Sequence, residues 1–549
     1  MTSTSSVSTG GYASTVSRYD FDSQALIEAA VAAKLSRAGI YQDKIEANDT
    51  KISAYLELQS LLLDLQDATQ ALRSPTGISS ASDDVFLDRA GYLYSSNSTN
   101  ATTLMEATID EGTDIGNHTI LIQQMATAAK IGGNSNIADR TSDLGYDGVF
   151  AINGSDITIE SDMSLDEIVE QINNYKADTG VTASVIKVSD SAYMLVLTAE
   201  EAGEAITANA VSGEKILTGL GILDSDGDLA NVLQDAQKAI LTVDGVTVER
   251  STNDIDDILD GVTLHVYSAD PSTTVTLEIA NDLESVADAV EAFVNTYNAL
   301  RDYIITNQTV ESDGTVSDEA VLFGDGTLRS ISQTIATVLS GGIDDATLAE
   351  IGIKYDKNNY LVIDGDTFKN ALTDNLDVFK QLFSYQCGIS NGNLGLVSHG
   401  DGQKNLDFDL EITLDTDGSI ASVSVDGDSS LFTIDGTTIK GAEGTEYEGL
   451  KFLYTGSVST TISVSITQGI ADQLYHDVEA VADLTSGTLT EMIEGLGSAN
   501  EDYEKRISTI ESAAVTYQEY LIARYAEIEA QLSEAETTLA LLEQLTDSD

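Results

Sequence analysis

Both ends of the chain carry long runs in which apolar residues recur every three or four positions, and the segments between them have mostly β character. A lone helix cannot bury so narrow an apolar seam, so each end needs a partner helix, either the other end of the chain or another subunit. This pattern is typical of an assembly protein. The N-terminal series is Tyr55, Leu58, Leu62, Leu65, Thr69 and Leu72. The C-terminal series is Ile507, Ile510, Ala514, Tyr517, Leu521, Tyr525, Ile528, Leu532, Ala535, Leu539 and Leu542.

The C-terminal series contains one irregularity. Its steps alternate between three and four residues, but the two steps on either side of Leu521 are both four. Such an insertion locally unwinds a supercoil. Two interpretations stay open: Leu521 is a hinge between a bundle and a mobile leg, or the spacing reflects ordinary packing irregularity.

The two ends also differ in charge. Residues 1–75 hold nine acidic and six basic side chains, whereas residues 467–549 hold eighteen acidic and three basic ones. We therefore expect the basic residues of the first segment to face the acidic C-terminal helix, each exposed pair contributing well under about 1 kcal/mol. The apolar seam would supply most of the stability. The basic residues concerned are Lys34, Arg37, Lys44, Lys51 and Arg73.

Composition sets the class of protein. At 549 residues the chain is too long for one core, and about three to five domains are expected. A hydrophobic content of 42% is enough for packed domains. The net charge of −65 argues against nucleic acid or an anionic membrane as the main partner, because phosphate binding needs clustered Lys and Arg. The acidity itself indicates either a well-solvated surface or an acidic binding face.

Targeting signals are scarce. The first twenty residues are rich in Ser and Thr, and they lack the basic start and apolar stretch of a secretory signal peptide. They are predicted to form a disordered tail. No window approaches about eighteen consecutive apolar residues, so no transmembrane helix or membrane insertion is expected. Cys387 is the one cysteine and cannot form an internal disulfide.

Turn and cap signals divide the chain further. A first helix is predicted from an N-cap at Asp22-Ser23 to about Gly39, and a second from about Gln42 to Arg73, before the break at 74–77. Short β-branched runs follow from about 80 to 280, with a hairpin signal at Asp244-Gly245. Helices return from Leu283, with a short β excursion at 353–363 and a last helical stretch at 368–383.

A compact unit is predicted inside the first β region. It has two strands, an amphipathic helix and two further strands, and Ser164 and Glu167 have the spacing of a capping box at the start of that helix.

We therefore expect an α+β multidomain protein in which a discontinuous helical bundle and terminal coiled-coil legs carry inserted β-rich domains. Helices far apart in sequence would share one bundle. The predicted parts are a disordered export tail with an N-terminal leg helix (1–40), a coiled-coil or bundle helix (41–76), a β-rich head (77–149 and 207–281), an inserted small α/β unit (150–206), a helical bundle (282–387), a second β-rich insertion (388–466) and C-terminal bundle and leg helices (467–549).

Several segments, in this order, resemble the flagellar filament cap family, also called flagellar hook-associated protein 2. The unit that begins at Phe150–Ile159 is similar to a small repeat shared by flagellins and hook-associated proteins. More specific to the cap family are the order and spacing of Val243–Asn253, Asp260–Leu264 and Phe293–Leu300. The resemblance extends to Tyr19–Ala29, Leu348–Ile353, Leu361–Gly365, Leu382-Phe383 and Gly469–Leu474.

The resemblance implies a secreted, extracellular protein at the tip of the bacterial flagellum. There it would form a homo-oligomeric ring that retains exported flagellin subunits and promotes their insertion into the growing filament. It also implies an export chaperone and the flagellar type III export apparatus as partners. Three alternatives remain: flagellin itself, a hook-filament junction protein, and an adhesin that binds a surface through its β domains.

No catalytic, metal or cofactor site is predicted. The four histidines, His118, His265, His399 and His476, lie in different segments, which argues against a metal or catalytic cluster. Residues 224–228 alternate carboxylates as a calcium loop does, but the later ligand positions do not fit, so turn chemistry is favoured. Weak divalent-cation binding stays open in so acidic a chain, and an enzyme is the least expected class.

Overall fold

The computed structural model describes residues 23–74, 84–213, 216–343, 346–400 and 405–546. The predicted disordered tail and the break after Ser74 lie outside these residues. The chain forms two compact units, one built from residues up to 74 together with those from 289 onward, and one from residues 75–288. The α+β multidomain fold expected from the sequence is confirmed. None of the helices in the described ranges has an apolar stretch long enough to cross a membrane.

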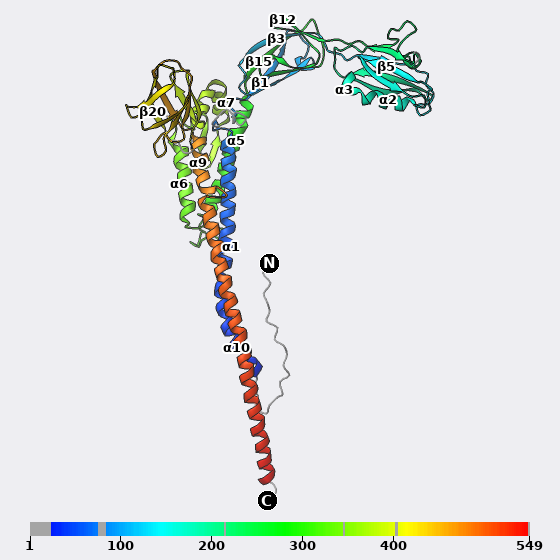
Figure 1. Ribbon diagram of the computed structural model, residues 1–549. Helices are drawn as coiled ribbons and strands as arrows, with labels where there is room; N and C mark the ends of the chain where they lie inside the picture. Colours follow the sequence, from blue (N-terminus) through cyan, green and yellow to red (C-terminus); the bar gives the residue numbers. More distant parts are fainter. Residues whose placement is uncertain (1–22, 75–83, 214–215, 344–345, 401–404, 547–549) are drawn as a thin grey trace. The chain divides into compact units, whose positions relative to one another are not determined.

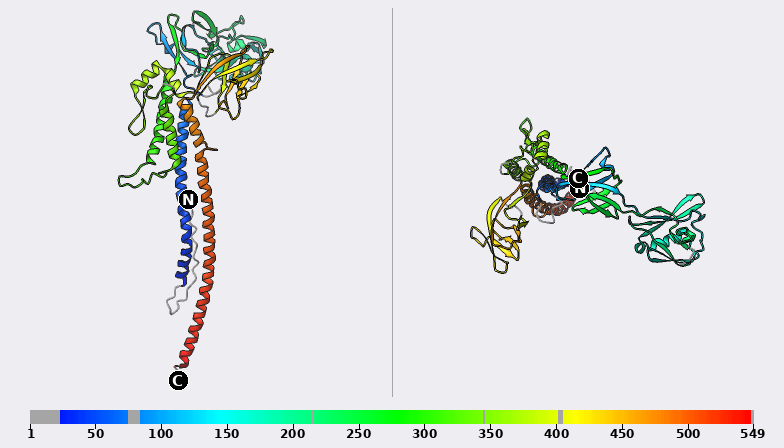
Figure 2. Two further views of the ribbon diagram at one scale, coloured as in Figure 1. Left: turned by 90° about the vertical axis from the view of Figure 1, so that its left-hand side faces the viewer. Right: turned by 90° about the horizontal axis from the view of Figure 1, so that it is seen from above.

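The first unit is organised around helices from distant parts of the chain. Helix α1 runs beside α10 in both side views, and α9 precedes α10 (Figures 1 and 2). Helix α5 buries an apolar face that includes Val290, Phe293 and Leu300. The helices of this unit are α1 (Ser23–Gln70), α5 (Leu283–Thr306), α6 (Gly326–Gly341), α7 (Gly365–Asp374), α8 (Leu376–Phe383), α9 (Ile470–Ala482) and α10 (Thr488–Thr546), α5 beginning in the second unit.

One predicted helix boundary is wrong. Instead of ending near Gly39, the first helix continues as one element, α1, of 48 residues. A glycine costs a helix only about 1 kcal/mol relative to alanine, and packing against α10 outweighs that cost. The helical stretch expected over 368–383 is present as two helices, because the backbone at Asn375 leaves the helical region between α7 and α8.

The first unit also contains a β sandwich, which we call the C-terminal β domain. Its two four-stranded antiparallel sheets have the orders β18-β25-β20-β21 and β19-β24-β23-β22. Residues of both sheets, among them Leu410, Ile439 and Phe452, share one core. The strands are β18 (Gln386–Ile389), β19 (Leu394–Ser398), β20 (Leu406–Leu414), β21 (Ile420–Val425), β22 (Phe432–Asp435), β23 (Thr438–Gly441), β24 (Lys451–Tyr454) and β25 (Thr460–Thr467). A separate hairpin joins β16 (Ile353–Tyr355) and β17 (Leu361–Ile363), where the β excursion was predicted.

The second unit contains a five-stranded sheet of order β1-β15-β3-β11-β12 and a three-stranded sheet of order β13-β14-β2. The two sheets share a core that includes Met105, Leu241 and Leu277. The predicted hairpin at Asp244-Gly245 joins β11 to β12, with Val243 paired to Val246. The elements are β1 (Arg89–Ser95), η2 (Ala101–Thr103), β2 (Met105–Ile109), β3 (Gly116–Gln124), β11 (Ala239–Val243), β12 (Val246–Arg250), β13 (Asp254–Leu259), β14 (Val262–Val266) and β15 (Thr274–Asn281).

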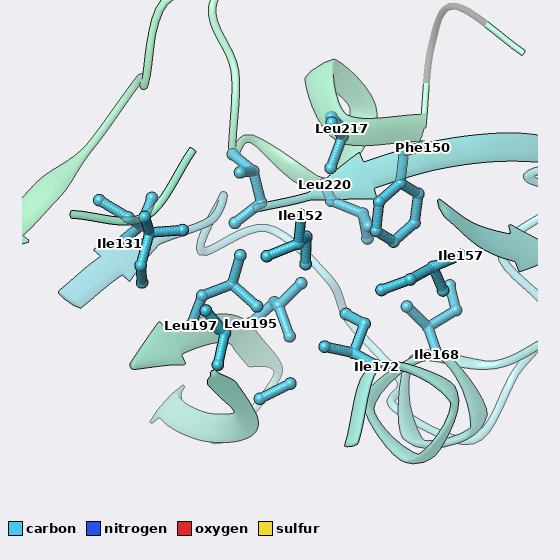
Figure 3. Close-up of a cluster of buried hydrophobic side chains, with 14 of the residues drawn as sticks. Ile131, Phe150, Ile152, Ile157, Ile168, Ile172, Leu195, Leu197, Leu217 and Leu220 are labelled. Atoms are coloured by element: carbon cyan, nitrogen blue, oxygen red, sulfur yellow. The ribbon is translucent and has the colours of Figure 1, made fainter. Parts of the chain in front are cut away.

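The predicted compact unit has its own core in the second unit. Figure 3 shows Phe150 and Ile152 gathered with Ile168 and Ile172 in one apolar cluster. The capping box of α2 is present, with both the Ser164 and the Glu167 side chains bonded to backbone N–H groups. The core extends beyond the predicted bounds of 150–206, because Ile131 and Leu220 belong to it. The elements are β4 (Lys130–Gly132), β5 (Gly148–Ile152), β6 (Ser155–Ile159), α2 (Leu165–Asn174), α3 (Lys176–Thr179), β7 (Val181–Ser189), β8 (Ala192–Ala199), β9 (Ala208–Ser212), α4 (Ile216–Leu220) and β10 (Val232–Gln234).

Candidate functional site: the terminal helix pair

The two ends of the chain pair with each other, as their apolar seams and charges suggested. The Ser23 hydroxyl of α1 donates to Glu529 of α10 at 2.7 Å. Further along α1, the Asn48 side-chain amide donates to Asn500 at 2.8 Å. Residue numbers rise along α1 where those of the contacting residues in α10 fall, so the two helices are antiparallel (Figure 2).

Polar side chains recur along the seam of this pair. In α1, every seventh residue from Ile27 onward faces α10. The next three of these residues, Lys34, Tyr41 and Asn48, are polar or aromatic. Lys34 Nζ lies 4.2 Å from the ring centroid of Tyr517. The rings of Tyr41 and Tyr503 are 5.6 Å apart. We call the pairs Lys34–Tyr517, Tyr41–Tyr503 and Asn48–Asn500 the polar rungs. A polar group on such a seam lowers stability but fixes the register of the helices.

Small apolar contacts lie between the rungs and the start of α1. Ile27 and Val31 of α1 pack with Ala514 of α10 in one buried cluster. The half-buried side chains packed against this cluster are Leu35, Leu521, Ile522 and Tyr525.

The predicted seam residues of the N-terminal segment are fully buried, and all of them except Leu72 lie in α1. The side chains of Tyr55, Leu58, Leu62, Leu65 and Leu72 are each 0% exposed. In the same stretch, the Gln59 side-chain amide donates to the Ala482 carbonyl at 3.0 Å, which fastens α1 to the end of α9.

The predicted seam residues of α10 form a graded series. Seven of them are half-buried along α10: Ile507, Ile510, Tyr517, Leu521, Tyr525, Ile528 and Leu532. Leu539 and Leu542 are 59% and 56% exposed. They lie in the part of α10 that extends beyond Glu529, the residue opposite the start of α1. Their role in oligomerisation stays a prediction. So does the hinge at Leu521, through which α10 runs without a break.

The predicted charge pairings hold only in part, since Lys34 and Lys44 lie over tyrosine rings of α10 rather than against its carboxylates. Lys51 faces Asp325 at 3.2 Å rather than α10. Asp325 precedes α6 and accepts hydrogen bonds from the N–H groups of Thr327 and Leu328 at its N-terminus. Tyr55 donates to the same carboxylate at 2.7 Å. Burial alone would raise the pKa of Asp325, but the bonds from Tyr55, the Leu328 N–H and Lys51 hold it below its usual 3.8. The nearly buried Asp325 carboxylate, which caps α6, therefore binds Lys51 and connects α1 to α6.

A buried ion pair lies just beyond the C-terminal end of α1. Arg73 Nε donates to Asp472 of α9 at 3.1 Å, and the Asp472 side chain is 0% exposed. Burial would raise the pKa of Asp472, but His476, the charge of Arg73 and a hydrogen bond from Gln468 hold it below its ordinary value. Charge therefore joins the two ends of the chain where the predicted seam is most buried.

Three further observations bear on metal binding and thiol chemistry. Within the described ranges, no group of three or more His, Cys, Asp or Glu residues is placed to hold a metal ion. The Asp224 carboxylate accepts from the backbone N–H groups of Asp226 and Asp228, which is turn chemistry. Burial raises the pKa of the Cys387 thiol to about 11, which disfavours the reactive thiolate.

Sequence reasoning missed the polar rungs, because it followed apolar residues and stopped at Tyr55. The signal was available as a strict spacing. Counting back from Tyr55 in sevens gives Asn48, Tyr41, Lys34 and Ile27, the positions that contact α10.

Three family models match the chain. "Flagellar hook-associated protein 2 N-terminus" matches residues 20–129, and "Flagellar hook-associated protein 2 C-terminus" matches residues 236–537. Between them, "Flagellin hook IN motif" matches residues 145–201, the region of the compact inserted core. The two longer matches include most of α1 and α10 and so contain the helix pair.

Curated relatives carry the same family name. Flagellar hook-associated protein 2 of Escherichia coli K12 is 30% identical over 372 residues, covering 64% of this chain and 75% of that protein. The Salmonella typhimurium protein of that name is 33% identical, but the match covers 41% of this chain and about half, 49%, of the relative. A crystal structure of the D1-D2-D3 domains of the flagellar cap protein FliD from Escherichia coli matches with 29% identity over 60% of this chain and 90% of that one, at a TM-score of 0.46.

Proposed function

This chain belongs to the flagellar hook-associated protein 2 family, and from that membership we propose that it forms the oligomeric cap at the distal tip of a bacterial flagellar filament. The observation that carries the proposal is the match of both family models to the segments that build the helix pair. A protein of this class is a structural part of the flagellum rather than an enzyme.

The cap would act on flagellin subunits that arrive at the tip. In this proposal the ring retains exported flagellin and promotes its insertion beneath the cap. The chain itself would leave the cell through the flagellar type III export apparatus, with an export chaperone as an earlier partner. The flagellin and junction-protein alternatives are not favoured, because both end segments match models named for hook-associated protein 2. The adhesin alternative gains no support from these matches.

We assign ring formation in part to the exposed end of α10. Leu539 and Leu542 continue the seam of the helix pair but are more than half exposed. An exposed apolar seam of this kind suits contact with other copies of the chain. The double variant Leu539→Asp with Leu542→Asp should reduce the oligomer in sedimentation. The matched change Thr538→Asp, at an exposed neighbour, should leave it intact. Equal oligomers in both variants would contradict this assignment.

Immunogold labelling of intact flagella tests the cap function itself. With antibody against residues 150–280, gold should mark the distal tip alone, and a strain lacking the gene should release unassembled flagellin into the medium. Label along the shaft would instead make this a filament protein, and label at the base a junction protein.

A further inference from the structure

A buried histidine lies at the joint between the C-terminal β domain and the helices. His399, just after β19, stacks on Tyr385 with ring centroids 3.7 Å apart and planes inclined by 18°. The two side chains are 9% and 7% exposed. Tyr385 lies between α8 and β18, so this ring stack spans the point where the chain enters the domain.

Both chain connections of the β domain end on the same cluster of charges. At the entrance, the Tyr385 N–H donates to the Arg73 carbonyl at 3.0 Å. At the exit, the Gln468 side-chain amide donates to Asp472 at 2.8 Å. Asp472 also receives Arg73, and Arg73 Nη2 lies 3.2 Å from His476 Nε2. Loosening this cluster would therefore release the domain at both of its attachments.

The site is built for a neutral His399. Its Nδ1 lies 3.1 Å from the Gly400 carbonyl, which fixes that nitrogen as the donor. Its Nε2 is buried and has no hydrogen-bond partner among the described residues, and the same holds for the Tyr385 hydroxyl. A proton on Nε2 would place a buried charge beside Arg73 and His476, which disfavour it, whereas Asp472 favours it. Asp472 is already engaged by Arg73 and Gln468.

We propose that His399 is an acid-sensitive switch in this joint: its protonation loosens the C-terminal β domain from α1 and α9. At neutral pH the stacked ring pair and the Arg73–Asp472 cluster hold the domain. In acid, the charged imidazolium gains solvation when the joint opens.

The direction of the pH dependence follows from linkage. Burial lowers the pKa of His399 below its usual 6.5, and the opposing effects of the Gly400 carbonyl and Asp472 do not restore it. The open joint therefore binds more protons than the closed one below pH 6.5. Stability of the joint is complete above that value and falls as the pH falls toward the lowered pKa. Uptake of one proton raises the opening constant by at most about tenfold per pH unit. The pKa of Asp472 lies below 3.8, so this carboxylate acts only at lower pH.

Hydrogen exchange of the full-length protein tests the switch. Exchange is measured at about pH 7.5 and about pH 5.5, with rates corrected for the intrinsic effect of pH on exchange, which leaves an opening change of up to about tenfold. Segments 385–398 and 468–476 should lose protection in acid in the wild-type protein, whereas the core around residues 150–172 should not. His399→Phe, which keeps a stacking ring but cannot titrate, should abolish the response.

Two variants complete the test. His399→Gln replaces the titrating group by a polar side chain that does not titrate, and it should also abolish the acid response. With two variants, the result does not depend on the folding of either one alone. His265→Phe removes a histidine of the second unit, one bonded to Asp254, and should leave the response unchanged. Equal protection of the wild-type joint at both pH values, or an acid response that survives both His399 variants, would overturn the proposal.

Discussion

The two halves of α1 hold their partners in different ways. In the second half, from Tyr55 onward, the seam is fully buried among several helices and contains tyrosine and leucine. In the first half the buried residues are Ile27, Val31, Ala38 and Ala54, and the polar rungs alternate with them. One helix therefore serves both as a core element and as a strip of contact to a single partner. The first half gains little stability from burial and gains its register from polar contacts.

Removal of the ion pair at the top of α1 should give the largest effect. Arg73→Ala leaves the Asp472 carboxylate buried without its cation, a loss of about 3–5 kcal/mol for buried pairs. The matched change in the first half, Lys34→Ala, removes a contact to the Tyr517 ring and should cost less than about 1 kcal/mol. Urea unfolding followed by far-UV circular dichroism compares the two. Similar losses would show that both halves rest on the same kind of contact.

Cavity-forming changes should separate the halves next. Leu58→Ala in the second half removes a side chain with no exposed surface and should cost about 2–5 kcal/mol. Val31→Ala, in the small cluster with Ala514, should cost about 1 kcal/mol. Thermal unfolding of the two variants under identical conditions measures the difference. A larger loss for Val31→Ala would reverse the account of which half forms the core.

The smallest expected effect is a gain. Gly39 lies inside α1, and a Cβ built there meets no atom within 4 Å. Gly39→Ala should therefore stabilise the first half of α1 by up to about 1 kcal/mol through helix propensity. Hydrogen exchange of the peptides around residue 39 should slow, with peptides of the second half unchanged. Faster exchange around residue 39 would mean that the helix needs a flexible point there.

Local signals predicted local structure well. The capping box at Ser164 and the turn at Asp244-Gly245 depend on neighbouring residues, and both are present. The end of a helix at Gly39 was wrong because a partner some 470 residues away in sequence decides it. Lys51 reached Asp325 rather than α10 for a similar reason, since the sequence does not show that the carboxylate preceding α6 lies beside α1.

In the candidate site, too, the sequence predicted the features that local patterns determine and missed those that distant partners determine. Apolar periodicity located the buried seam at Tyr55 and Leu58, because burial leaves a strong pattern. It could not locate Asn48 or Asn500, whose importance comes from facing each other. His399 and His476 lie in different segments of the sequence, yet both lie on the Arg73–Asp472 cluster, because the fold returns the chain to the same joint.

Cysteine cross-linking tests the central claim, that α1 and α10 of one chain pair in the register marked by the polar rungs. In a Cys387→Ser background, Asn48→Cys with Asn500→Cys should form an intramolecular disulfide in the full-length protein, since these side chains touch at 2.8 Å. The control pairs Asn48→Cys with Ile507→Cys, one heptad further along α10, and should stay reduced under the same oxidation. Equal cross-linking of both pairs, or disulfides only between different chains, would contradict a registered pair of terminal helices.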